Sequence, residues 1–167
     1  DVEMSNGPLK WVSEKDGTKA TLKSTFQKED GATLENHILE CTFRYEEELD
    51  RTQIVYNDEF GHAIIIQLSP DYHHVRKWPD QDLLHRCEEF PDASGSSLKP
   101  GELYTVTVEM CKSEFLIRIN DNDFLFGENY RAGRAKHRIA VSVEGGQSTL
   151  ESIRLWEGTP RSDWTKN

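Results

Sequence analysis

The residues best suited to metal chemistry in this chain are four histidines and one cysteine in its middle third. These potential ligands are His62, His73, His74, His85 and Cys87. Imidazole nitrogens and thiolates are the ligands that zinc prefers, and zinc motifs place them at short, regular separations. The spacing here matches none of those motifs. We therefore expect histidines on the surface or in a groove, without a metal ion between them.

A run of four oxygen-rich residues, Asn120 to Asp123, is the second candidate for binding a cation. Calcium prefers carboxylate and amide oxygens, and Asp121 and Asp123 would be its charged ligands. The run lacks the glycine and glutamate that complete the common calcium loop, and Asn and Asp are also preferred turn residues. We expect a turn, with calcium as the alternative. No glycine-rich phosphate loop and no activated serine or cysteine motif indicates another cofactor or a nucleophile.

Carboxylates for glycoside hydrolysis are the third possibility, because this reaction commonly uses two acids that flank one bond. The pattern Glu-x-Asp-x-x-Glu, which would align such acids along one strand, does not occur in the sequence. Glu40 and Glu109 are isolated acids in alternating stretches, where every second side chain faces solvent. The sequence therefore assigns no catalytic residue.

Aromatic rings beside planar hydrogen-bonding side chains form a different kind of candidate site. A ring stacks on the apolar face of a sugar, while neighbouring amides, guanidinium groups or imidazoles bond the hydroxyls. The chain offers this mixture on strands or strand ends between residues 44 and 78. We predict a carbohydrate groove that uses Arg44, Tyr56, Asn57, His74, Arg76 and Trp78. Alternatively, its aromatic members are ordinary core or rim residues.

Strands must position these side chains, because alternation of apolar and polar residues dominates the chain. The clearest case lies in the last third, where residues 104–110 and 115–119 alternate on either side of a turn at Lys112–Glu114. The residues between Val106 and Ile119 that point inward should form part of the core. Two further strands are predicted over 138–143 and 149–156, with a hinge at two glycines between them.

The first half of the chain shows the same period. We predict strands over 21–26, 39–45, 53–57, 62–69 and 72–78, with a four-residue connection between the third and fourth. Ile64, Ile65 and Ile66 are apolar on both faces, which is typical of a central strand covered on both sides. Phe43, Ile65, Val106, Val108 and Ile117 are predicted to be buried. Residues 79–99 lack the pattern and should form a long irregular surface loop.

Many short strands with almost no helix predict an all-β fold, a sandwich of two antiparallel sheets. The segments 100–108, 115–121 and 152–156 resemble the laminin-G and concanavalin A-like jelly rolls. Within that superfamily the chain resembles the bacterial 3-keto-disaccharide hydrolase-like domains, and its tail from Trp156 through Pro160 to Trp164 resembles the ending of the planctomycete members. The resemblance implies a jelly-roll fold and glycoside-processing relatives.

Composition and charge narrow the classes of protein further. The chain has 167 residues and a net charge of −10, with 35% hydrophobic and 30% charged residues, which fits one globular domain over residues 1–167. The negative charge repels phosphate backbones, so nucleic acid is not an expected partner. No apolar run reaches the roughly 18 residues that a membrane helix needs. Three cysteines, Cys41, Cys87 and Cys111, allow at most one disulfide and leave its pairing open.

Three functional classes follow from these observations. The first is a carbohydrate-binding domain that works in the periplasm, at the cell surface or after secretion. The chain begins at Asp1, which is compatible with the removal of a leading segment. The second class is a diverged glycoside hydrolase of the 3-keto-disaccharide type, and the third is a structural or protein-interaction module. The sequence leaves the sugar and the oligomeric state open.

The missing pair of acids predicts that the protein has no endoglucanase activity on ordinary β-glucans. The measurement is release of reducing sugar from soluble β-glucans. Turnover that disappeared in a Glu40→Gln variant would contradict this prediction and would make that strand acid a catalyst.

Overall fold

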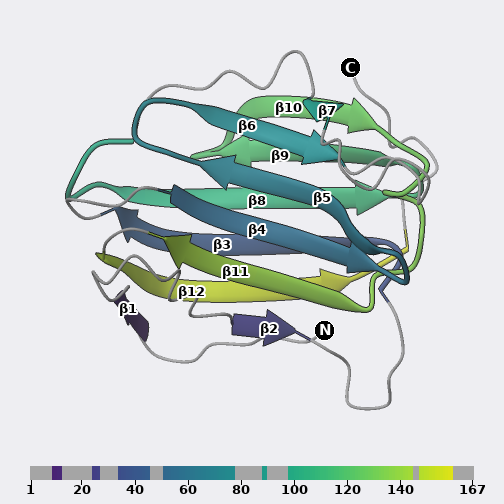
Figure 1. The fold of residues 1–167 in the computed structure, drawn as a ribbon, viewed down its shortest axis with the longest axis horizontal. Coiled ribbons are helices and arrows are strands. Elements are labelled where there is room, and N and C mark those ends of the chain that lie inside the picture. Colours follow the sequence, from purple (N-terminus) through teal and green to yellow (C-terminus); the bar gives the residue numbers. More distant parts are fainter. Residues whose placement is uncertain are drawn as a thin grey trace.

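The computed structural model describes residues 9–12, 24–26, 34–45, 51–77, 88–89, 98–144 and 147–159, and in these ranges the chain forms two antiparallel six-stranded sheets (Figure 1). The strands of sheet A, in spatial order, are β1 (Leu9–Val12), β12 (Gln147–Glu157), β3 (His37–Tyr45), β8 (Leu103–Cys111), β9 (Glu114–Ile119) and β10 (Asn122–Glu128). The strands of sheet B are β2 (Ser24–Phe26), β11 (Arg138–Glu144), β4 (Arg51–Asp58), β5 (Gly61–Leu68), β6 (His73–Lys77) and β7 (Glu88–Glu89). The predicted all-β sandwich is confirmed.

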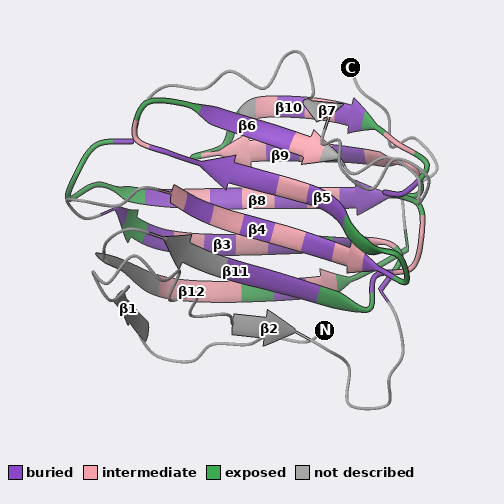
Figure 2. Ribbon diagram, viewed as in Figure 1, coloured by how far each residue is buried: buried purple, intermediate pink, exposed green. Residues whose placement is uncertain are grey.

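The core lies between the two sheets and follows from the alternation in the sequence (Figure 2). In β3 and β8 every second side chain is buried, as expected for strands that cover a core with one face only. Phe43, Val106, Val108 and Ile117 are at most 2% exposed, so their predicted burial is confirmed. Gly127 of β10 lies directly against the ring of Phe115, where a Cβ atom would meet ring carbon at 2.3 Å. The core is therefore tightly filled at this edge.

β5 departs from the prediction at one residue. It does lie inside sheet B, between β4 and β6, and Ile64 and Ile66 are fully buried. Ile65 points to the opposite side and is only half-buried, so its predicted place in the core is wrong. A run of three isoleucines cannot distinguish a strand covered on both sides from one whose outer face keeps some access to solvent. The outer face of sheet B thus carries an apolar side chain that water can reach.

The turns are tighter than the sequence indicated. β4 and β5 are joined by two residues, Glu59 and Phe60, instead of the predicted four, because the strand pairing continues to Asp58 and Gly61. Gly61 has a φ of 107°, a conformation that favours glycine. The backbone N–H of Phe60 donates to Oδ1 of Asp58 at 2.9 Å and so stabilises the turn.

The predicted loop over residues 79–99 contains a short strand. β7 pairs with β6 at the edge of sheet B, where Arg76 lies opposite Glu89. Trp78, His85 and Cys87 lie outside the described residues. Cys41 and Cys111 are buried free thiols, and burial raises the pKa of Cys41 to about 12. Within the described part of the chain, no helix is long and apolar enough to cross a membrane.

The contrast between Ile117 and Ile65 provides a test of the fold. Ile117→Ala should lower the free energy of unfolding by about 2–5 kcal/mol, because it removes packed atoms and leaves a cavity. Ile65→Ala should cost roughly 1 kcal/mol, because its side chain is only half removed from water. Urea unfolding followed by tryptophan fluorescence measures both. Equal losses in the two variants would contradict this assignment of inner and outer faces.

Candidate functional site

The outer face of sheet B brings polar and aromatic side chains into neighbouring rows. Since the inward set of β4 is buried, the alternate residues of β4, and those paired with them on β5, β6 and β11, point away from the core. The register defines three rows across the sheet, which are His74–Gln67–Gln53, Arg76–Ile65–Val55 and His62–Asn57–Arg138. We call these nine residues the sheet B face.

Two glutamines form the centre of the first row. Nε2 of Gln53 donates to Oε1 of Gln67 at 3.1 Å, and Nε2 of Gln67 lies 3.5 Å from the hydroxyl of Ser69. Gln67 is only 1% exposed, whereas Gln53 is half-buried. Fixed amides with a defined orientation are suited to recognising a pattern of hydroxyl groups.

An exposed aromatic ring stands at the end of this row. Tyr72 is 50% exposed, and its ring centre lies 5.1 Å from that of His74 at an interplanar angle of 52°. His74 is itself buried, so it supports one side of the tyrosine ring. The other parts of the ring are open to a ligand that offers an apolar surface.

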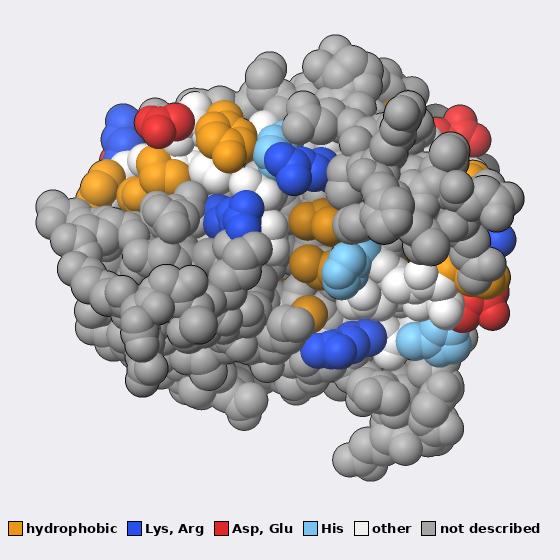
Figure 3. Space-filling model, in the orientation of Figure 1, with side chains coloured by type: hydrophobic (Ala, Val, Ile, Leu, Met, Phe, Trp, Pro, Cys, Tyr) orange, Lys and Arg blue, Asp and Glu red, His pale blue; other side chains and the backbone are white. Residues whose placement is uncertain are grey.

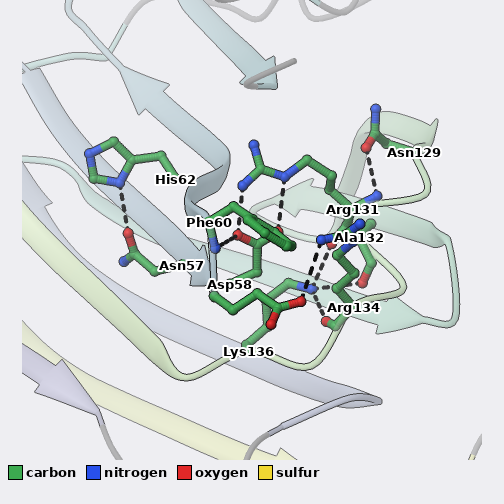
Figure 4. A network of polar contacts seen from close by, with 10 residues as sticks. Asn57, Asp58, Phe60, His62, Asn129, Arg131, Ala132, Arg134 and Lys136 are labelled. Carbon is green, nitrogen blue, oxygen red and sulfur yellow. Dashed lines mark hydrogen bonds and ion pairs between the residues drawn. The ribbon is translucent and has the colours of Figure 1, made fainter. Parts of the chain in front are cut away.

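The third row contains a second oriented polar pair. Nδ1 of His62 and Oδ1 of Asn57 are 2.7 Å apart (Figure 4). The main chain of Asn57 is also fixed, because its carbonyl accepts a hydrogen bond from the N–H of His137 at 3.0 Å. The pair orients the imidazole of His62 and the amide of Asn57 relative to each other.

Hydrophobic side chains lie between these polar rows. Val55 and Ile65 are half-buried neighbours in the middle row. Where Figure 3 colours this face by residue type, hydrophobic, histidine, and arginine or lysine side chains lie side by side. An apolar floor with hydrogen-bonding groups on two sides matches the two kinds of surface that a sugar ring presents.

A buried ion pair holds the end of β4 in place. Nε and Nη2 of Arg131 donate to the two carboxylate oxygens of Asp58 at 2.9 and 2.6 Å, and both side chains are at most 4% exposed (Figure 4). Burial alone would raise the pKa of Asp58, but the hydrogen bonds from Arg131 and the Phe60 N–H, with the charges of Arg131 and Lys136, lower it below its ordinary value. The carboxylate is therefore ionised where it binds Arg131.

Lys136 extends this network into the loop before β11. Its Nζ donates to the carbonyl oxygens of Arg131 and Ala132 at 2.9 Å and to that of Arg134. Burial lowers the pKa of Lys136 to about 8; the charge of Asp58 opposes this shift, whereas those of Arg131 and Arg134 add to it. Lys136 is thus mainly in its ammonium form at neutral pH, and the carbonyl groups of the loop surround this ammonium group.

The loop is also attached to the two sheets. The main chains of Lys136 and Leu34, just before β3, exchange two hydrogen bonds of 2.6 and 3.0 Å. Cζ of Arg134 lies 4.4 Å from the centre of the Phe60 ring in the β4–β5 turn. The network therefore fixes the turn from which Asn57 and His62 project.

Three of the predicted groove residues, Asn57, His74 and Arg76, lie together on the sheet B face. Arg44 is exposed on the outer face of sheet A, where its Nη1 donates to the Gly101 carbonyl at 2.9 Å, so it belongs to the opposite side of the sandwich. Tyr56 is fully buried in the core between the sheets and does not line this face. Trp78 lies outside the described residues.

The cation candidates do not form a ligand set in the described part of the chain. No group of three His, Cys, Asp or Glu side chains there is suited to hold a metal ion. His73 points inward and packs against Phe124, with ring centres 5.9 Å apart, whereas His74 points outward. Asp121 lies in a turn with a φ of 64°, next to Asn120, whose Oδ1 accepts the Thr105 N–H at 2.9 Å. The side chain of Asp123 is not described.

Sequence reasoning missed Gln53 and Gln67 as members of the site. Both lie on predicted strands, but a single glutamine in an alternating stretch carries no signal of its own. The signal is in the pairing, because Gln53 lies directly opposite Gln67 and Gln67 opposite His74. Cross-strand neighbours of this kind appear only when the register is known.

A separate hollow of about 220 Å³ lies at one end of sheet A. Ile38, Trp156 and Cys111 are among the residues that line it, together with Glu109. It contains none of the residues predicted for the groove. The sheet B face therefore remains the candidate site.

Comparison with known proteins identifies the fold. No family model matches the chain, and no curated protein matches its sequence. A Caenorhabditis elegans galectin, LEC-6, is similar in structure with a TM-score of 0.60 and 10% identity, over 89% of this chain and 96% of that one. The carbohydrate-binding module CBM66 of Bacillus subtilis gives 0.63 and 11%, over 94% and 100%. Chicken galectin 2 gives 0.58 and 9%, over 74% and 93%. These likenesses confirm a jelly-roll β-sandwich.

The buried ion pair leads to a prediction about stability. Asp58→Asn should lower the free energy of unfolding by about 3–5 kcal/mol at neutral pH, because it leaves the buried charge of Arg131 without a counterion. Glu59→Gln is the matched control; its exposed carboxylate lies 3.5 Å from Arg134 and should matter by less than about 1 kcal/mol. Urea unfolding measures both variants.

The difference in the free energy of unfolding between the parent protein and Asp58→Asn should depend on pH. Because the pKa of Asp58 is lower in the folded protein, its stabilising contribution is present above the ordinary aspartate value of 3.8 and is lost as the pH falls below it. The difference between the parent protein and Asp58→Asn should therefore shrink in acid. A difference that stayed constant down to full protonation would exclude the ion pair as its cause.

Proposed function

We propose that this protein is a carbohydrate-binding domain and that the sheet B face is its binding site. The observation that carries the proposal is the combination on this face of oriented amides, imidazoles and a guanidinium group around half-buried apolar side chains. The exposed ring of Tyr72 stands at one end of the face. A sugar needs both polar and apolar contacts in fixed positions, and this face offers both.

The dimensions of the face suit a short oligosaccharide. The strands β6, β5, β4 and β11 lie side by side, so the face is about 14 Å wide at a spacing of about 4.8 Å between strands. We expect one sugar to lie against Tyr72 and Gln53, whose amide is oriented by the buried Gln67, and a further sugar to extend toward Asn57 and His62. A sugar hydroxyl that lost its hydrogen bonds to water on binding and gained none from the protein would reduce the binding free energy by about 1–3 kcal/mol. The fixed amides would select one sugar in this way.

The structural neighbours support this proposal because one of them, from Bacillus subtilis, is by name a carbohydrate-binding module on the same fold. The resemblance to 3-keto-disaccharide hydrolase-like domains keeps a diverged hydrolase as a prediction from the sequence. A location outside the cytoplasm, where extended glycans are accessible, is part of our proposal. A glycan-array screen beside a hydrolysis assay on 3-keto and ordinary disaccharides distinguishes binding from turnover.

Tyr72 is the residue whose replacement tests the site most directly. Tyr72→Ala should weaken binding of a glycan found in the screen roughly threefold to tenfold, because one ring contact contributes about 0.5–1.5 kcal/mol. Its melting temperature should stay near that of the parent protein, because half of the side chain is already exposed.

Tyr130→Ala is the matched control, since Tyr130 is 49% exposed and lies in the loop that precedes β11. It should leave binding unchanged. Isothermal titration calorimetry measures the affinity of both variants. Equal effects of the two substitutions, or full binding by Tyr72→Ala, would refute the sheet B face as the site.

A further inference from the structure

One end of the outer face of sheet A carries a hollow of about 220 Å³, separate from the sheet B face. Three of its lining residues form a row across the sheet, since Trp156 of β12 lies opposite Ile38 of β3, and Ile38 lies opposite Glu109 of β8. The residues of β3 and β8 on either side of this row are buried, so Ile38 and Glu109 point away from the core. The hollow therefore lies on the outside of the sandwich, on the sheet that the proposed sugar site does not use.

Asn36 fixes two sides of the hollow. Its Oδ1 accepts the N–H of Lys112 in the turn between β8 and β9 at 2.9 Å, and its carbonyl accepts the N–H of Gly158, just after β12, at 3.2 Å. Asn36 and Gly158 both line the hollow, and these bonds tie the ends of β8 and β12 to the start of β3. Hydrogen bonds within the chain thus hold the hollow in shape, and a preformed site loses less entropy when it binds a ligand.

Apolar surface in this hollow is open to water. Ile38 is 40% exposed and Trp156 is half-buried, although both are large apolar side chains. Cys111 is a buried free thiol that also lines the hollow, and burial raises its pKa, so it is uncharged at neutral pH. A ligand that covers Ile38 and Trp156 is favoured because it removes their surface from water.

The charged residues of the lining do not favour an ionic ligand. Glu109 forms an ion pair with Arg118 of β9, so its charge is balanced within sheet A. Glu157 is exposed at the rim and keeps its contact with water. A charged ligand would lose part of its own hydration against Ile38 and Trp156, which is costly without a new counterion. The ligand should therefore be uncharged.

From these observations we infer that the hollow binds a small uncharged molecule with one aromatic ring, of the size of phenol. A cavity of about 150 Å³ accepts benzene, so a hollow of about 220 Å³ has room for one ring with a short substituent and is too small for two. The indole of Trp156 favours an aromatic partner, because rings attract each other in stacked and edge-to-face arrangements. A sugar ring would place hydroxyl groups against Ile38 and Cys111, where they would lose hydrogen bonds to water.

An NMR titration of the isotope-labelled protein with phenol tests this inference. The indole N–H of Trp156 and the backbone amides of Ile38 and Gly158 should shift and saturate, with a dissociation constant of roughly 1 mM or below. Cyclohexanol should bind about threefold to tenfold more weakly, because it lacks the contact between aromatic rings. Benzoate and methyl glucoside should bind more than about tenfold more weakly than phenol, because a charge or several hydroxyl groups would lose water.

Variants of the outer face of sheet A assign the binding to the hollow. Trp156→Ala should weaken phenol binding more than about tenfold, and Ile38→Ala about threefold to tenfold, because each removes a wall of the hollow. Leu103→Ala is the matched control, since Leu103 is 44% exposed on the same face but lies opposite Arg44, at the other end of β3. It should leave the affinity unchanged, as should Tyr72→Ala. Thermal melts show whether each variant is folded; if Trp156→Ala is not, the exposed Ile38 still provides the test.

Three outcomes would overturn the inference. The first is the absence of saturation up to about ten times the expected dissociation constant. The second is an equal effect of Leu103→Ala and Ile38→Ala, or shifts that centre on Tyr72, since either would place the binding elsewhere. The third is binding of methyl glucoside as tight as that of phenol, which would make the hollow a second sugar site. None of these results depends on whether the sheet B face binds glycans.

Discussion

The ion pair between Asp58 and Arg131 is the contact on which the arrangement of the candidate site depends. It is formed by residues 73 positions apart in the chain and is almost inaccessible to water. Two buried charges cost much to desolvate, so such a pair persists only when its geometry is good and its neighbours satisfy the remaining donors. Here the Phe60 N–H shares the carboxylate, and Lys136 bonds the carbonyl of Arg131. The pair thereby holds the β4–β5 hairpin turn and the loop before β11 in a fixed arrangement.

The position of this pair explains how a scaffold of two sheets presents a polar surface without losing its core. The residues of β4 alternate, so Asp58 and Tyr56 point inward while Asn57 points outward. Fixing Asp58 from inside also fixes the direction of Asn57 on the other side of the same strand. Main-chain bonds from Lys136 to Leu34 and from His137 to Asn57 carry this constraint to both sheets. The order of the site therefore derives from the core beneath it.

Much of the fold could be predicted from the sequence, because period-2 alternation is a local signal. β3, β8 and β9 were predicted close to their observed bounds, and Phe43 and Ile117 are buried as expected. The site was predicted only in part, because membership of a face depends on pairing across strands. Tyr56 and Asn57 are neighbours in the sequence but lie on opposite sides of sheet B, and Arg44 belongs to the other sheet. The residue types in a segment do not reveal on which sheet or face a side chain lies, whereas the register of the strands does.

The positions of the charged residues on the two sheets follow the pairing of the strands. On sheet A the outward arginines are paired with acids on the neighbouring strands, as with Arg154 and Glu40 at 3.2 Å and with Arg118 and Glu109. Opposite charges on adjacent strands stabilise the sheet locally and cancel each other's field. The register of sheet B likewise places Glu89 opposite Arg76 and Glu144 opposite Arg51. Arginine and glutamate therefore occupy paired positions on neighbouring strands in both sheets, so neither sheet carries a row of arginines alone.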